Sequence, residues 1–158
     1  AGNYAGSFYP TSLAIEKGFD QIVWTDSVNH KLIEEAGTMN IFFRINNKLI
    51  TPKHTDTILD GVTRKSVITV AKDSGIDVEI RDIEVSEIIQ EYENGNLTEV
   101  FGAGTAAVIA PISSFGYKEK KYILKDIDDP FGPIIKKKIV DIQNNLTEDK
   151  YNWRYQVI

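Results

Sequence analysis

The stretch HKLIEEAGTMNIFFRINNKLITP, residues 30–52, sets the expectation for the fold. Residues 41–43, Ile-Phe-Phe, are apolar without interruption, so this part does not alternate between a polar and an apolar face. A short continuous apolar run is typical of a strand that is buried on both faces. Asn46 and Asn47 interrupt the pattern and predict a turn between two strands.

The segments on either side of this stretch show helix and strand patterns in alternation. Ser86 is the expected N-cap of one helix, and Pro10 predicts a kink or a restart in another. Helices are predicted over residues 4–17, 57–75, 86–95 and 132–145, and further strands over residues 21–26, 77–84, 97–112 and 120–124. Strands mixed with helices in this order predict an α/β or α+β domain built on a mixed sheet.

Size and composition exclude several classes of protein. The chain has 158 residues, which indicates one domain, and its net charge of −5 without a broad basic patch argues against nucleic-acid binding. It contains no cysteine, which excludes disulfides and thiolate chemistry and fits a cytoplasmic protein. The longest apolar run, residues 106–112, is too short to span a bilayer, so no membrane partner is expected.

The stretch DGVTR, residues 60–64, places a glycine directly before a predicted helix. The first N–H groups of that helix, on Val62, Thr63 and Arg64, have no partner inside the helix, and the helix dipole adds partial positive charge there. The stretch therefore predicts an anion-binding helix start. An ordinary helix start capped by solvent explains the same residues and remains the simpler alternative.

The stretch FGAGTAAV, residues 101–108, combines two glycines with small alanines and the hydroxyl of Thr105. Its spacing is similar to a dinucleotide-binding fingerprint, but that fingerprint must open a helix. Here the following residues, which include Pro111, have the pattern of a strand. The sequence therefore predicts a tight glycine turn between two strands, with an anion-binding turn as the alternative.

Glu34 and Glu35 stand in a segment that otherwise looks buried. Neighbouring residues of a strand point to opposite faces, so one of the two carboxylates is expected to face the interior. A buried carboxylate is costly unless it meets a cation or hydrogen-bond donors. A bound cationic group is one solution, and a salt bridge with an arginine such as Arg44, Arg64 or Arg81 is the other.

The remaining polar residues indicate no other chemistry. His30 and His54 stand far apart in the sequence, so no metal site is predicted. No serine, histidine and aspartate spacing supports a catalytic triad.

Four stretches together resemble the branched-chain amino acid aminotransferases, which are pyridoxal 5′-phosphate enzymes of fold type IV. The stretches are GNYAGS at residues 2–7, EEAGTMNIFF at 34–43, TILDGVTRKSV at 57–67 and EVFGAGTAAVIAPI at 99–112. The resemblance implies a mixed β-sheet that is partly closed into a barrel with flanking helices. D-amino acid aminotransferases and aminodeoxychorismate lyases share this fold but differ at the Thr-Met pair, and they remain enzymatic alternatives. A non-catalytic binding domain is the alternative from another class.

The resemblance also implies which residues contact the ring of the cofactor. Glu35 matches the glutamate that pairs with the protonated pyridine nitrogen, which would supply the cation that a buried carboxylate needs. Leu59 matches the residue that packs on one face of the ring. Tyr4 matches the tyrosine that hydrogen-bonds the 3-oxygen of the cofactor.

Other matching positions concern the phosphate and the substrate. The backbone N–H groups of Val62 and Thr63 match the donors to the 5′-phosphate, and Thr105 matches a second phosphate contact. The N–H of Ala106 matches the donor to the substrate α-carboxylate, and Thr38 matches a threonine near the substrate and the ring.

Residues 1–4 match the last four positions of the family pattern K-x-[GA]-G-N-Y. The lysine that binds the cofactor as a Schiff base is therefore expected upstream of Ala1, and no catalytic residue is expected within residues 1–158. These residues are expected to form the C-terminal cofactor-binding domain, without the N-terminal small domain, and to be inactive alone. The resemblance implies that the parent protein transfers the amino group of Leu, Ile or Val to 2-oxoglutarate, as a homodimer or higher homo-oligomer.

Overall fold

The structure is a computed structural model that describes residues 2–157, with side chains from residue 5 onward. Its centre is a five-stranded sheet in the order β5-β4-β3-β6-β7. The strands are β3 (Asn40–Ile45), β4 (Lys48–Thr51), β5 (Val78–Ile80), β6 (Leu97–Gly104) and β7 (Val108–Pro111). Only β4 and β5 run parallel, and the other neighbours are antiparallel. The predicted mixed sheet with helices is therefore confirmed.

Strand β3 is buried along its whole length, as its apolar run predicts. On one face, the ring of Phe42 stacks on that of Phe101 with 5.1 Å between centroids. On the other face, Ile41 and Phe43 belong to a separate apolar cluster. The sheet therefore separates two cores, and β3 contributes to both because its successive side chains point to opposite faces.

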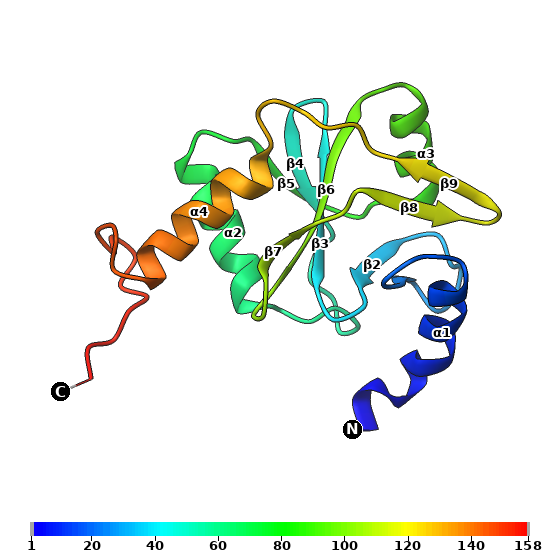
Figure 1. Cartoon of the computed structure of the whole chain (residues 1–158), viewed down its shortest axis with the longest axis horizontal. Coiled ribbons are helices and arrows are strands. Elements are labelled where there is room, and N and C mark those ends of the chain that lie inside the picture. The colour runs from blue at the N-terminus through cyan, green and yellow to red at the C-terminus, as the bar shows by residue number, and fades with distance from the viewer. Residues whose placement is uncertain (1, 158) are drawn as a thin grey trace.

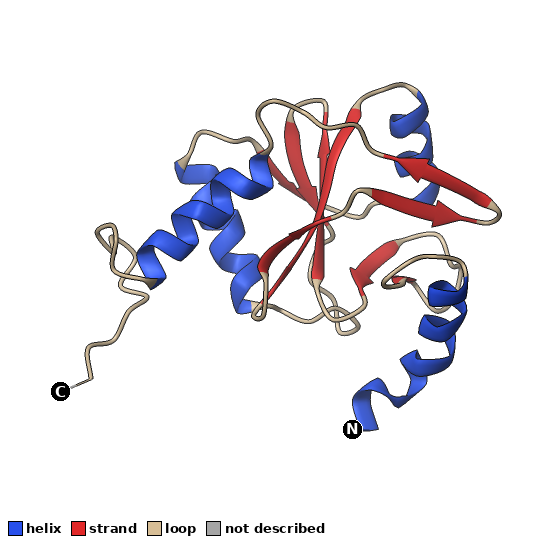
Figure 2. Ribbon diagram, viewed as in Figure 1, coloured by secondary structure: helices blue, strands red, loops and turns tan. Residues whose placement is uncertain are grey.

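Both faces of this sheet are covered by other elements. Helices α2 (Val62–Asp73) and α4 (Phe131–Gln143) pack on the face that carries Phe42. The other face is covered by α3 (Val85–Glu93) and by the hairpin of β8 (Ser114–Tyr117) and β9 (Lys120–Ile123) (Figures 1 and 2). Among the described residues, none of the helices is long and apolar enough to cross a membrane.

The chain begins with elements that lie beside the main sheet. They are the 3-10 helix η1 (Gly2–Ser7), α1 (Phe8–Glu16), β1 (Val23–Thr25) and β2 (Ile33–Ala36). Pro10 lies in the first turn of α1, where a missing N–H is tolerated, so the restart of the helix occurs at Phe8 and not at the proline. Strands β1 and β2 form a separate two-stranded antiparallel sheet.

Three details of the sequence-based expectation are wrong or not confirmed. Helix α3 has Glu84 as N-cap, and the hydroxyl of Ser86 donates to the Glu84 carboxylate instead of accepting a backbone N–H as an N-cap would. Gly102 and Gly104 lie inside β6, so the turn that follows is built from residues 105–107. Within residues 2–157 the five-stranded sheet is open, with β5 and β7 at its two edges, so the expected partial barrel is not confirmed.

Candidate functional site

The three stretches singled out in the sequence lie along one edge of the molecule, at the bottom of Figure 1. They are the hairpin between β2 and β3, the loop that leads into α2, and the turn between β6 and β7. The carboxylate of Glu35 accepts a hydrogen bond from the N–H of Leu59 at 3.3 Å, which joins the first two. Asn40 pairs with Ala103 across β3 and β6, which joins the hairpin to the strand that leads into the turn between β6 and β7.

The hairpin between β2 and β3 turns on two residues. Ala36 and Met39 exchange backbone hydrogen bonds of 2.8 and 2.7 Å, which leaves Gly37 and Thr38 at the tip. Gly37 has φ of +53°, in the left-handed region where glycine carries no steric penalty. Thr38 is exposed, so its hydroxyl can reach a ligand at this edge of the molecule.

Met39 explains the two glycines of β6. A Cβ on Gly102 would lie 2.8 Å from Met39 Cε, and a Cβ on Gly104 would lie 3.1 Å from Met39 Cγ. The methionine therefore lies directly on the backbone of β6. Close approach by this side chain explains both glycines, which the sequence had suggested to be a turn or an anion site.

The turn between β6 and β7 is strained at Val108. This β-branched residue has φ of +60°, and the N–H of Ile109 donates to the carbonyl of Ala107 at 2.7 Å across it. Thr105 and Ala106 are exposed at the tip of the turn. Strained backbone is concentrated at ligand-binding sites in proteins, so the position of Val108 is consistent with a functional turn.

Glu35 is partly buried, and burial raises the pKa of its carboxyl above the ordinary value. The nearby charge of Glu34 acts in the same direction, whereas the hydrogen bond from Leu59 N–H acts against it. Glu34 itself accepts a hydrogen bond from the hydroxyl of Thr57 at 2.7 Å. The two carboxylates thus bind the same loop at two points.

Two of the three arginines proposed as partners of Glu35 are bound elsewhere. Arg44 forms an ion pair with Asp129 at 3.2 Å. Arg64 is buried and donates to the carbonyl oxygen of Pro52 at 2.7 Å.

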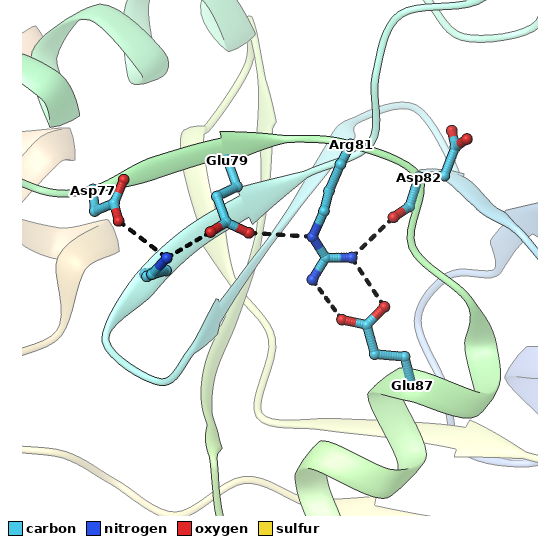
Figure 3. A network of polar contacts seen from close by, with 6 residues as sticks. Asp77, Glu79, Arg81, Asp82 and Glu87 are labelled. Carbon is cyan, nitrogen blue, oxygen red and sulfur yellow. Dashed lines mark hydrogen bonds and ion pairs between the residues drawn. The ribbon is translucent and has the colours of Figure 1, made fainter.

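The third arginine belongs to an ion-pair network at the edge of the sheet (Figure 3). Arg81 donates to Glu79 at 3.2 Å and to Glu87 at 3.0 Å, and Lys48 bridges Glu79 and Asp77. Among the described residues, none of the three arginines pairs with the buried carboxylate. The salt-bridge explanation is therefore wrong for all three, and the carboxylate is available to a bound cationic group.

Helix α2 begins without a side-chain cap among the described residues. Its N-cap is Gly61, and none of the described side chains caps its first N–H groups. Val62 is 80% exposed and Thr63 is half-buried. Free N–H groups at the start of a helix form an anion site, so the backbone here suits a phosphate group.

The loop before α2 holds Leu59 in one orientation. Its N–H donates to Glu35, and its carbonyl oxygen accepts hydrogen bonds from Asn40 Nδ2 at 2.9 Å and from the N–H of Gly61 at 2.8 Å. The side chain of Leu59 is nevertheless 71% exposed. An exposed leucine side chain on a backbone held by hydrogen bonds offers an apolar surface on which a flat ring can pack.

These groups suit a ligand with a phosphate at one end and a protonated ring nitrogen at the other. The free N–H groups of α2 and the hydroxyl of Thr105 would serve the phosphate, and the Glu35 carboxylate would serve the nitrogen. Tyr4 lies in η1, but its side chain falls outside the described residues, so its expected contact is not tested. The roles expected of Thr38 and Ala106 likewise stay predictions.

Three residues that the sequence-based predictions omit also shape the site, namely Met39, Asn40 and Val108. For Asn40 a signal existed, since a polar residue at the start of an otherwise apolar strand requires a buried partner. For Val108 there was none, because nothing in the local pattern predicts a left-handed conformation at a β-branched residue.

The known sequences that are similar to this chain are those of aminotransferases. Residues 1–115 match the family described as amino-transferase class IV. Over 160 aligned residues, the chain is 44% identical to the "Probable branched-chain-amino-acid aminotransferase" of Staphylococcus epidermidis and 41% identical to the "Branched-chain-amino-acid aminotransferase 2" of Bacillus subtilis. Each alignment covers 99% of this chain and 44% of the relative, so the chain spans less than half the length of these relatives.

Solved structures show the same similarity. The branched-chain amino acid aminotransferase of Escherichia coli matches 98% of this chain and 48% of its own chain, with a TM-score of 0.80 and 29% identity. Another branched-chain amino acid aminotransferase, solved with pyridoxamine 5′-phosphate, matches 96% of this chain and 46% of its own, with a TM-score of 0.78 and 25% identity.

Proposed function

The chain belongs to the amino-transferase class IV family, and from that premise we propose that it is the pyridoxal 5′-phosphate-binding part of a branched-chain amino acid aminotransferase. The observation that carries the proposal is the 44% identity, over 99% of the chain, to a relative named for this activity. The Glu35 carboxylate, which has no arginine partner among the described residues, and the uncapped start of α2 lie at the same edge of the molecule and support it from the structure.

The proposal assigns different parts of the active site to different parts of a longer protein. Because the relatives are more than twice as long as the aligned region, residues 1–158 are proposed to form the C-terminal cofactor-binding domain. The rest of the protein would supply the lysine that binds the cofactor covalently and the smaller domain that completes the substrate pocket. On this proposal the chain alone does not transaminate.

At the ring end of the cofactor, Glu35 would hold the proton on the pyridine nitrogen. The bound cofactor withdraws electrons from the α-carbon of the amino acid and thereby makes its proton acidic. A carboxylate with no arginine partner among the described residues is suited to keep this nitrogen protonated. Leu59 would pack on one ring face, and Tyr4 would donate to the 3-oxygen.

At the other end, the backbone N–H groups of Val62 and Thr63 would bind the phosphate, together with Thr105. The N–H of Ala106 would donate to the substrate α-carboxylate, and Thr38 would lie near the substrate. The turn between β6 and β7 would then contact both cofactor and substrate, and its fixed shape would align one with the other.

The proposed substrates are Leu, Ile or Val as amino donors and 2-oxoglutarate as the acceptor. The proposed assembly is a homodimer or a higher homo-oligomer, and the proposed location is the cytoplasm. The relatives' names support the branched-chain substrates. The acceptor and the assembly rest on the family resemblance, and the location rests on the absence of cysteine from the sequence.

Assays of the full-length gene product test the proposal. The protein, loaded with pyridoxal 5′-phosphate, is incubated with 2-oxoglutarate and either L-leucine or D-alanine, and separately with aminodeoxychorismate. We expect glutamate to form with L-leucine only. Turnover of D-alanine or aminodeoxychorismate in preference to L-leucine would contradict the branched-chain assignment. Turnover of L-leucine by residues 1–158 alone would contradict the proposal that the rest of the protein supplies the catalytic lysine.

A further inference from the structure

Asn40 is a buried polar residue in the proposed cofactor site to which the proposed function gives no role. It is 5% exposed and opens strand β3, directly after the hairpin that follows Glu35. Its amide nitrogen donates to the carbonyl oxygen of Leu59 at 2.9 Å. A buried amide that donates to a loop 19 residues away helps to fix the position of that loop.

The oxygen of the same side chain lies against the N-cap of α2. A Cβ on Gly61 would overlap Asn40 Oδ1, so no side chain at position 61 fits beside this oxygen. Gly61 therefore approaches Asn40 as closely as a residue without a side chain permits. One side chain thus donates a hydrogen bond to Leu59 through its nitrogen and packs its oxygen closely against Gly61.

Leu59 and Gly61 belong to different ends of the proposed site. Leu59 lies at the ring end, where Glu35 binds its N–H, and Gly61 opens the helix start at the phosphate end. Asn40 also pairs with Ala103, two residues before Thr105. Asn40 therefore contacts the loop before α2 and pairs with the strand that leads into the turn between β6 and β7.

We propose that Asn40 is the positioning residue that holds the ring-binding and phosphate-binding ends of the site at the spacing of one cofactor molecule. This inference rests on the proposed function, because it assumes that pyridoxal 5′-phosphate binds here. Asn40 does not itself touch the cofactor; it acts through Leu59 and Gly61.

The spacing of the two ends determines how tightly a molecule that uses both ends is bound. A ligand that reaches two sites at once gains affinity only if the sites match its length. Loss of Asn40 leaves both ends present but lets the loop before α2 move. The variant is therefore expected to lose affinity for pyridoxal 5′-phosphate, while pyridoxal and inorganic phosphate, each of which uses one end, lose little.

The test uses the full-length protein after removal of its cofactor. Dissociation constants for pyridoxal 5′-phosphate, pyridoxal and inorganic phosphate are measured for the wild type and for Asn40→Ala. We expect at least about a tenfold loss for pyridoxal 5′-phosphate, as for one lost positioning hydrogen bond, and a loss below about threefold for the other two.

Thr51→Val is the matched control. Thr51 is fully buried in β4 and donates to the carbonyl oxygen of Ile41 at 2.8 Å, a bond of the same kind within the same sheet. We expect this variant to have a lower melting temperature and unchanged affinities for all three ligands. An equal loss with Thr51→Val would show that destabilisation alone explains the result for Asn40 and would overturn the inference.

A second pair of variants tests the same contact through Gly61. In the wild type, Gly61→Ala is expected to weaken binding of pyridoxal 5′-phosphate, because its Cβ collides with Asn40 Oδ1. In the Asn40→Ala background the same change is expected to have a much smaller effect. If Asn40→Ala fails to fold, Asn40→Asp, which keeps the shape but lacks the donor, replaces it in the comparison of the three ligands.

The outcomes separate this inference from the function on which it rests. If Asn40→Ala binds pyridoxal 5′-phosphate as the wild type does, or loses affinity equally for all three ligands, the positioning role is wrong. If the wild type binds no pyridoxal 5′-phosphate, the proposed function is wrong.

Discussion

The carboxylate of Glu35 and the backbone N–H of Leu59 form a hydrogen bond of 3.3 Å across 24 residues of sequence. This bond connects β2, beside the main sheet, to the loop that opens α2. It leaves the rest of the carboxylate without an arginine partner among the described residues. The contact therefore supports the loop and still leaves the Glu35 carboxylate free to bind a ligand.

Glu35→Gln tests the charge of this carboxylate. Glutamine can still accept the Leu59 N–H, so the fold is expected to be retained, but it cannot form a charge-assisted bond to a protonated ring nitrogen. We expect affinity for pyridoxal 5′-phosphate to fall by a factor of about ten to one hundred, from a charged hydrogen bond of about 1.5–3 kcal/mol. Equal affinity in calorimetric titrations of the two full-length proteins would contradict the role of Glu35.

The pH dependence of stability tests the burial of the same group in cofactor-free protein. Because burial raises the pKa of Glu35, the folded state holds this proton more tightly than the unfolded chain, whose ordinary value is 4.5. Stability contributed by the protonated group is fully present below that value and is lost as the pH rises through the folded pKa.

The measurement compares the wild type with Glu35→Gln in urea denaturation from about pH 4 to about pH 8. The wild type is expected to lose stability relative to the variant as the pH rises, and the difference then levels off. A constant difference would show that folding does not change the pKa of Glu35, and a change in the opposite direction would show that folding lowers it.

The strained backbone at Val108 predicts that glycine at this position gives a more stable protein than alanine, which is the reverse of the usual order. Val108→Ala and Val108→Gly both remove the side chain that packs against the core near α2 and α4. Only glycine also relieves the φ of +60°, which costs an ordinary residue about 1–2 kcal/mol. We expect Val108→Gly to be more stable than Val108→Ala by about 1 kcal/mol in urea denaturation, and the usual order, with alanine the more stable, would contradict the strain.

Glu99 caps helix α4 from the neighbouring strand β6. Its two carboxylate oxygens accept the N–H groups of Phe131 and Gly132 at 2.7 and 2.8 Å. In Glu99→Gln, an amide NH₂ group replaces one acceptor and faces an N–H donor. We expect a loss of about 1–3 kcal/mol in the free energy of unfolding, because a buried donor is left without an acceptor.

Glu119→Gln is the control for this prediction. Glu119 is exposed in the turn between β8 and β9 and, within the described part of the chain, pairs only with Lys17 at the surface. Its substitution is expected to change the free energy of unfolding by less than about 0.5 kcal/mol. Equal effects of the two changes would show that Glu99 does not act as a cap.

The local pattern of the sequence predicted the parts of the fold that depend on neighbouring residues. The apolar run of β3 indicated burial on both faces, and Asn46 and Asn47 adopt the positive φ values of a tight turn where a turn was expected. The hairpin of β8 and β9 was recognised only in its second strand, since residues 114–117 are half polar and lack a clear alternating pattern.

The sequence by itself determined the mixed sheet and, through the stretches around Glu35, Val62 and Thr105, the family to which the chain belongs. Only the tertiary structure decided how those stretches meet: which arginines are engaged elsewhere, that Met39 occupies the space left by two glycines, and that Asn40 connects both ends of the site. The physical reason is the sequence separation over which each kind of information acts. Periodicity reports on residues a few positions apart, whereas these contacts join side chains and loops that the packing of separate elements brings together.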